Sequence, residues 1–298
     1  MRLATYRYNE QQLPAILDGD YAIIPALDPE HANLQSMLQL IDAGPDMISR
    51  LADWLPGAPD ACKIANDPRR LCAPIPVPRQ NVICLGWNYA EHAIESSQAR
   101  QRDIKLPEHP IVFTKAVSSV NDPYHEILVD PGVTQELDWE VELAIVIGHK
   151  TRKVSREEAL DAVFGYTVVN DLSARDLQFR HKQYFIGKSL DGACPMGPVI
   201  VTSDEIPDPQ DLRLRSWVNG ELKQDSSTRF QIFDCADIIY RLSQSMTLYP
   251  GDIIATGTPE GVGFARQPPE FLLDGDLVEC EVSGIGRLQT RIKSSRGG

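Results

Sequence analysis

Two glutamates, Glu140 and Glu142, lie one residue apart in the segment LDWEVELAIVIG, which otherwise has the composition of a buried strand. Side chains alternate between the two faces of a strand, so both carboxylates lie on one face, side by side. Carboxylates this close repel, and each raises the pKa of the other. A divalent cation would remove the repulsion, because hard cations such as Mg²⁺ prefer oxygen ligands. The alternative is that the pair belongs to a solvent-exposed face.

A third carboxylate that could join this pair is Asp171, at the polar end of the apolar segment FGYTVVND. Functional side chains collect where regular elements give way to loops. Ser173 follows at the position of a helix cap, with Asp176 three residues further on. Asp171 is therefore either a metal ligand or a residue of the turn before this helix.

Two further positions could act on a bound substrate. His92 and Glu95 in NYAEHAIE are three residues apart and share one face of a predicted helix, where a glutamate can orient a histidine base. Their spacing alone favours an ordinary solvated pair. Lys188 follows a glycine in FIGKSLDG, and a lysine in this setting is most often exposed.

The elements that must position these residues are mostly strands. Apolar or alternating segments predict strands over 81–86, 110–117, 137–148, 164–171, 197–203, 213–224, 252–257 and 277–292, with a hairpin turn at Asn219-Gly220. Helices are predicted over 88–103, 155–163 and 233–246, the second from the capping-box spacing of Ser155 and Glu158. Few helices between many strands favour a β-sandwich or roll over a doubly wound sheet.

The N-terminal part of the chain has a different pattern. Strands are predicted on either side of the turn Asp18-Gly19-Asp20, followed by helices over 31–44 and 45–55. Prolines at 74, 76 and 78 then form an extended connector. We expect an α+β protein rich in β structure, with a small N-terminal α+β domain (1–72) and a large domain (73–298) built as a mixed β-roll or β-sandwich.

Composition limits the partners. The 298 residues have a net charge of −13, which argues against nucleic acids and anionic membranes. No apolar run has the roughly 18 residues of a membrane helix, and the N-terminus lacks the apolar core of a signal peptide, so we expect a cytoplasmic protein. The six cysteines are scattered and indicate buried thiols. An anionic substrate would need a local cation to bind this acidic chain.

Several motifs together resemble those of the fumarylacetoacetate hydrolase family. In order along the chain they are GWNYAEHAIE, PIVFTKA, LDWEVELAIVIG, GYTVVNDLSARDLQ, FIGKSLDGACPMGP, VNGELKQ and GDIIATGTPEGVG. The segment GFARQPPEFLLDGD and the N-terminal unit resemble the bacterial branch with acylpyruvate hydrolases and oxaloacetate decarboxylases. The resemblance implies an Mg²⁺ or Mn²⁺ ion held by Glu140, Glu142 and Asp171, which would bind a small anionic 2-oxo acid.

The resemblance also implies roles for the other candidates. His92 would activate water with the help of Glu95, and the polar stretch after this helix would form a lid. Lys188 would stabilise an enolate or oxyanion. The remaining candidates for binding substrate are Gln178, Arg175, Gly257 and Thr258; Arg175 could instead pair with Asp171, and TGTP could be only a tight turn. The family's first motif often has a basic residue where this chain has Trp87, so one contact to a distal anion is missing there.

The expected activity is metal-dependent cleavage of a C–C bond beside a 2-oxo acid. Because both members of the His92–Glu95 pair are present, hydrolysis of an acylpyruvate is favoured. Oxaloacetate decarboxylation and isomerisation of a 2-hydroxyhepta-2,4-dienedioate-type diacid use the same metal site and stay open. A binding protein without catalytic activity is the remaining alternative. The resemblance and the apolar hairpins together predict a homodimer.

Overall fold

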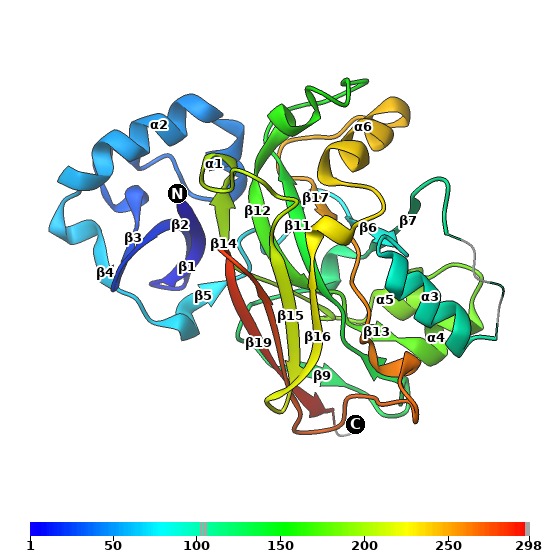
Figure 1. Ribbon diagram of the computed structural model, residues 1–298. Coiled ribbons are helices and arrows are strands. Elements are labelled where there is room, and N and C mark those ends of the chain that lie inside the picture. Colours follow the sequence, from blue (N-terminus) through cyan, green and yellow to red (C-terminus); the bar gives the residue numbers. More distant parts are fainter. Residues whose placement is uncertain (102, 104–105, 296–298) are drawn as a thin grey trace.

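The computed structural model describes residues 1–101, 103 and 106–295. Its main sheet runs through the order β4-β3-β2-β1-β14-β12-β11-β17-β6-β7. A second sheet, ordered β16-β15-β18-β19-β9, packs against the main sheet (Figure 1). This arrangement confirms the predicted β-rich α+β fold with two packed sheets.

The N-terminal unit supplies one end of the main sheet (Figure 1). It comprises β1 (Arg2–Tyr8), β2 (Gln11–Asp18), β3 (Tyr21–Ile23), β4 (Lys63–Ala65), β5 (Leu71–Cys72), α1 (Met37–Asp42) and α2 (Pro45–Trp54). The Asp18–Asp20 turn joins β2 to β3 as predicted. The helix expected over 31–44 is shorter, because Ser36 accepts a hydrogen bond from the Gln39 N–H and so begins α1 at Met37.

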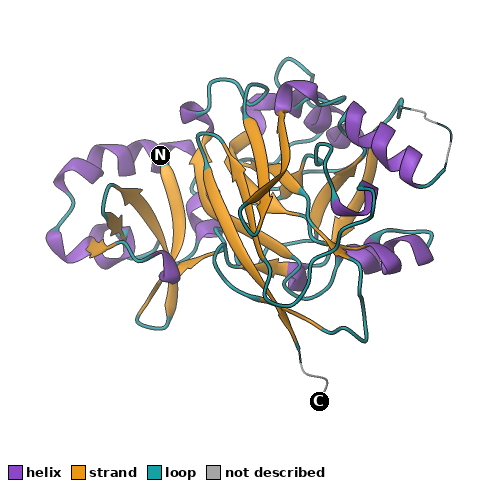
Figure 2. Ribbon diagram, turned by 60° about the horizontal axis from the view of Figure 1, so that its bottom comes forward, coloured by secondary structure: helices purple, strands orange, loops and turns teal. Residues whose placement is uncertain are grey.

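The large part of the chain supplies the rest of both sheets. Its strands are β6 (Val82–Gly86), β7 (Ile111–Lys115), β8 (Val120–Asn121), β9 (Ile127–Val129), β10 (Leu137–Asp138), β11 (Val141–Ile147), β12 (Val163–Asn170), β13 (Ser173–Ala174), β14 (Cys194–Thr202), β15 (Arg213–Val218), β16 (Glu221–Ser227), β17 (Ile253–Ala255), β18 (Leu277–Val282) and β19 (Gly286–Ser294). Its helices are α3 (Ala90–Ala99), α4 (Arg175–Arg180), α5 (Phe185–Lys188) and α6 (Cys235–Ser245). Figure 2 shows these helices at the margins of the strands.

Two sequence-based helix predictions need correction. The Glu158 N–H donates to Ser155 Oγ as in a capping box, but the Glu158 side chain accepts from the Ser155 hydroxyl rather than from its N–H, and only a 3₁₀ turn (Ala159–Ala162) follows. Ser173 does not cap α4; it lies in β13, and its hydroxyl donates to the Asp171 carbonyl. The cap position is Ala174, so α4 begins without a side-chain cap.

The predicted boundary between residues 72 and 73 crosses a continuous sheet. β1 pairs antiparallel with β14, so the N-terminal strands extend the large sheet. The connector separates β5 from β6, which lie in different parts of the same sheet. The division into two domains stays a prediction.

Strand β11 lies at the centre of the main sheet and is buried on both faces. One face, with Val141, Leu143 and Ile145, packs into the core shared with the second sheet. The opposite face, with Ala144 and Val146, packs with residues of α1 and α2 in a second apolar cluster. Glu142 alternates with the first set and therefore faces the side of Ala144, where neighbouring elements exclude water. The described residues include no helix long and apolar enough to cross a membrane.

Candidate active site

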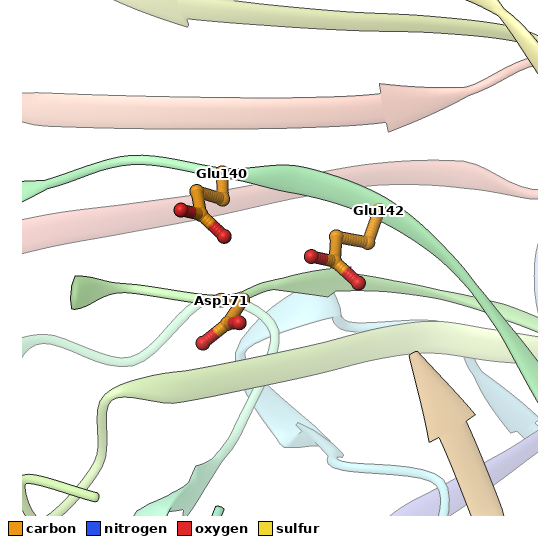
Figure 3. Close-up of side chains that lie close together, drawn as sticks. All are labelled: Glu140, Glu142 and Asp171. Carbon is orange, nitrogen blue, oxygen red and sulfur yellow. The ribbon is translucent and has the colours of Figure 1, made fainter. Parts of the chain in front are cut away.

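The structure brings the three predicted metal ligands together. Carboxylate oxygens of Glu140, Glu142 and Asp171 all lie within 4.8 Å of one another. Glu140 and Glu142 extend from the same side of one segment, and Asp171 lies beside them at the end of β12 (Figure 3). Glu142 and Asp171 are fully buried and Glu140 is 5% exposed. The alternative that the pair forms a solvent face is therefore wrong.

Three basic side chains surround these carboxylates. Lys188 Nζ lies 2.7 Å from both Glu140 Oε2 and Asp171 Oδ2. Lys115 Nζ lies 2.7 Å from Asp171 Oδ1 and donates to the Leu172 carbonyl. Arg175 contacts Glu140 Oε1 at 2.7 Å and Asp138 Oδ2 at 2.8 Å, rather than Asp171. Glu140 and Asp171 are thus paired with basic side chains, whereas none of the three contacts Glu142.

The two glutamates differ in their electrostatic surroundings. Burial alone would raise the pKa of Glu140, but Lys188, Arg175 and His92 outweigh it and lower this pKa to about 2. Burial, Asp171 and Glu140 hold the pKa of Glu142 well above its usual range. Burial would also lower the pKa of Lys188, yet Asp171 and Glu140 raise it above its ordinary value. Glu142 is therefore the carboxyl whose charge is least compensated.

Only one of the two carboxylate oxygens of Glu142 has a hydrogen-bond donor in the part of the chain that the structure describes. Oε2 accepts a hydrogen bond from the Gly257 N–H at 2.8 Å, whereas Oε1 has no hydrogen-bond partner among the described residues. A buried oxygen without a donor is costly unless a cation or water satisfies it. Three convergent carboxylates with a free oxygen fit Mg²⁺ or Mn²⁺, both of which take oxygen ligands. The residues present thus fit the metal that the sequence predicts.

His92 and Glu95 form a pair on α3 in which His92 is buried and Glu95 is half-buried. His92 Nδ1 lies 2.9 Å from Glu95 Oε1, and both oxygens of Glu95 accept from the Gly261 N–H. Because the carboxylate can only accept, Nδ1 holds the proton and Nε2 is the basic nitrogen. His92 is only 5% exposed, so the pair is not an ordinary solvated one.

One pocket joins the base to the carboxylates. Its lining includes His92, Glu140, Arg175, Lys188 and Thr258, with an aromatic rim from Trp87, Phe113, Phe179, Tyr184 and Phe264. The cavity measures about 30 Å³, enough for a water or two. The predicted lid segment includes residues 102, 104 and 105, which lie outside the described residues.

The predicted substrate contacts have different surroundings. Gln178 lines the pocket and accepts from Arg175 Nη1 at 2.9 Å. The Gly257 N–H and the Thr258 hydroxyl both donate to the metal-ligand segment, to Glu142 and to the Val141 carbonyl respectively. Their contact with a substrate carboxylate stays a prediction. Gly257 has φ +94°, and a Cβ there would lie 2.8 Å from Asn88 Cβ, so only glycine fits.

Two basic residues of this region were not predicted from the sequence. Lys115 is fully buried against Asp171, and its only sequence signal was a lysine at the end of an apolar strand in PIVFTKA. Arg100 lines the pocket and stacks over the Phe179 ring at 4.5 Å. Arg100 thus supplies a positive charge on the pocket wall although Trp87 replaces the basic residue expected in the first motif.

A β-rich fold with a buried carboxylate triad, one member of which shares a pocket with a histidine, defines a class of candidate metal-dependent enzymes. Residues 81–293 match the family model described as fumarylacetoacetate (FAA) hydrolase C-terminal. The chain belongs to the fumarylacetoacetate hydrolase family, a family of enzymes.

The chain is also similar to individual relatives and solved structures of this family. Oxaloacetate tautomerase YisK of Bacillus subtilis (strain 168) is 50% identical over 75% of this chain and 73% of its own. The mitochondrial oxaloacetate tautomerase Fahd2a of Rattus norvegicus is 38% identical over 90% of this chain and 89% of its own. A fumarylacetoacetate hydrolase from Exiguobacterium antarcticum superposes with a TM-score of 0.85 (40% identity; 99% and 100% covered). A maleylpyruvate hydrolase from Sphingobium sp. SYK-6, in complex with manganese(II) and pyruvate, superposes with a TM-score of 0.76. It is 30% identical in sequence, and the match covers 99% of this chain and 100% of that one.

Proposed function

We propose that this protein is a divalent-metal-dependent enzyme that enolises small 2-oxo acids, with keto–enol tautomerisation of oxaloacetate as its first candidate reaction. The observation that supports it best is the pocket lined by both His92 and Glu140, because Glu140 also belongs to the buried carboxylate triad. Proton transfer beside a 2-oxo group needs a base at carbon and positive charge at oxygen. The tautomerase relatives are the reason for placing oxaloacetate first.

Glu140, Glu142 and Asp171 would hold Mg²⁺ or Mn²⁺, which supplies Lewis-acid charge to a chelating 2-oxocarboxylate when bound. The buried cluster contains one more carboxylate than basic side chains when all are ionised: Asp138, Glu140, Glu142 and Asp171 against Lys115, Arg175 and Lys188. A divalent cation reverses that balance and makes the pocket suitable for an anion. This explains how an acidic chain binds an acidic substrate.

The chain's own residues then move the proton. His92 Nε2 takes a proton from C3 of the keto acid, and Glu95 holds the resulting imidazolium in place. Lys188 stabilises the negative charge that develops on the 2-oxo oxygen. Return of a proton to that oxygen gives the enol, so the reaction is a net proton shift with no co-reactant.

Hydrolysis of an acylpyruvate is the second candidate, as the sequence analysis favoured. His92 would deprotonate water instead of carbon, and the enolate of pyruvate would leave when the C–C bond breaks. The similarity to the maleylpyruvate hydrolase with pyruvate supports this alternative. Decarboxylation of oxaloacetate requires no base for its C–C cleavage and is the third.

A substrate panel tests the proposal. Oxaloacetate, acetylpyruvate, fumarylpyruvate and a hydroxyheptadienedioate-type diacid are each assayed with Mg²⁺ or Mn²⁺ and with EDTA. We expect the enol absorbance of oxaloacetate to equilibrate faster with enzyme and metal, and EDTA to remove the effect. Turnover of a substrate that persists at full rate in EDTA would contradict metal dependence, and no turnover of any substrate would favour a binding protein.

We also predict a homodimer. Val112 at the outer edge of the sheet and Phe185 and Ile186 on the adjacent α5 are 44%, 41% and 51% exposed, an apolar surface that a second copy would cover. Sedimentation equilibrium at micromolar concentration should give twice the chain mass of 33.2 kDa. A single species at 33.2 kDa would show that this surface has another role.

A further inference from the structure

The backbone around the metal-ligand pair has an unusual set of hydrogen-bond partners. β17 pairs with β11 only from Ala144 to Val146, and the chain beyond it turns away through residues 257–261. The Val141 N–H, between Glu140 and Glu142, therefore has no strand partner on this side. It donates instead to the side chain of Gln224, at 3.0 Å from Oε1.

Gln224 lies on β16 of the second sheet and is 1% exposed. Its Oε1 accepts from the Val141 N–H and from the Ser216 hydroxyl at 2.9 Å. Its Nε2 donates to Thr258 Oγ1 at 2.8 Å and to the Pro259 carbonyl at 2.9 Å. Both ends of this amide therefore have two hydrogen-bond partners each. The partners lie on β11 of the main sheet, on the adjacent strand β15 and in the loop at residues 258–259.

The donor end of this amide fixes the loop that reaches the base. The Thr258 hydroxyl, which accepts from Gln224, donates to the Val141 carbonyl. Two residues after Pro259, the Gly261 N–H donates to the Glu95 carboxylate. Gly261 packs so closely on β16 that a Cβ there would lie 2.3 Å from the Lys223 carbonyl. The loop therefore has one position relative to Gln224.

We propose that Gln224 is a positioning residue that keeps the metal-ligand pair and the His92–Glu95 base in one fixed geometry. The acceptor end of its amide holds the backbone between Glu140 and Glu142, and the donor end holds the loop behind Glu95. Gln224 does not line the pocket, so it acts through Val141 and Thr258. The inference rests on the proposed function, because it assumes that Glu140 and Glu142 bind a metal.

Two variants separate the two ends of the amide. Gln224→Met has nearly the same shape and removes all four hydrogen bonds, so we expect Mn²⁺ affinity to fall by about 10- to 100-fold, as for other partners that orient metal ligands. Gln224→Glu keeps the acceptors and loses the donors. It should bind Mn²⁺ within about threefold of the wild type and lose kcat, because the loop behind Glu95 is no longer held.

Gln210→Met is the matched control. Gln210 also makes three hydrogen bonds through its amide, to the Thr228 carbonyl, Gln231 Oε1 and the Cys235 N–H, but none to β11 or to residues 257–261. It should lower the melting temperature without changing Mn²⁺ affinity.

Calorimetry with Mn²⁺ on the purified proteins and steady-state kinetics give the readouts. Wild-type protein that binds no Mn²⁺ would contradict the proposed function itself. Wild-type binding with unchanged affinity and kcat in Gln224→Met would overturn the positioning role alone. If Gln224→Met does not fold, Gln224→Glu decides, and a kcat equal to that of the wild type overturns the proposal.

Discussion

Glu142→Gln should abolish Mn²⁺ binding and turnover together while leaving the fold intact. The amide keeps an oxygen for the Gly257 N–H but removes the negative charge that a divalent ion requires. Wild-type protein at about one hundred times the metal's Kd should gain about 2.7 kcal/mol of stability from binding, and the variant should gain none.

The melting temperature of the metal-free variant distinguishes loss of a metal ligand from misfolding. Burial and two neighbouring carboxylates raise the pKa of Glu142, so the metal-free protein is destabilised by this residue when it is ionised. A neutral amide relieves that cost, and we expect the metal-free variant to melt no lower than the wild type. Loss of binding through misfolding would instead lower the melting temperature.

Glu281→Gln provides the control for this experiment. Glu281 is also a strand glutamate, but it pairs with Arg215 and Arg287 on the second sheet, away from the pocket. Its substitution should leave Mn²⁺ affinity unchanged. If Glu142→Gln binds Mn²⁺ as tightly as the wild type by calorimetry, the metal-ligand assignment is wrong.

Local sequence patterns were sufficient for much of the fold and for the grouping of the glutamates. Alternation along residues 137–148 placed Glu140 and Glu142 on one face, although the predicted strand is broken and Glu140 lies between β10 and β11. The Asn219-Gly220 turn appears where predicted, with both residues at positive φ. The pattern could not show that this face is buried. That depends on Arg175, Lys188 and Gly257, which contact the two glutamates from later in the chain.

The supporting residues could not be predicted for a similar physical reason. Lys115 meets Asp171 across 56 residues, and Gln224 meets Val141 across 83. A buried lysine or glutamine has no periodic signature, because its burial depends on a partner that only the tertiary structure supplies. The helix expected over 155–163 is the opposite case: its local signal was real, but the Ser155–Glu158 pair is followed only by a 3₁₀ turn (Ala159–Ala162) before the chain enters β12 at Val163.

His92→Ala should separate decarboxylation from tautomerisation and hydrolysis, because only the last two need a base. Tautomerisation requires removal of a proton from carbon, and hydrolysis requires activation of water. Loss of the base should therefore slow both by about 10²-fold or more. Decarboxylation forms the same enolate by losing CO₂, and stabilisation of that enolate depends mainly on the metal and Lys188. We expect a much smaller loss for this reaction.

The measurement compares wild type, His92→Ala and His125→Ala on oxaloacetate and on an acylpyruvate, each with saturating Mn²⁺. His125 is an exposed histidine outside the pocket, so its substitution should leave all rates unchanged. Enol absorbance and release of CO₂ are followed separately for oxaloacetate, since one substrate can undergo both reactions. Equal losses in all three reactions would mean that His92 serves a shared step such as binding, and full rates in the variant would remove it from the mechanism. A loss confined to proton transfer and hydrolysis would establish the His92–Glu95 pair as the base of this site.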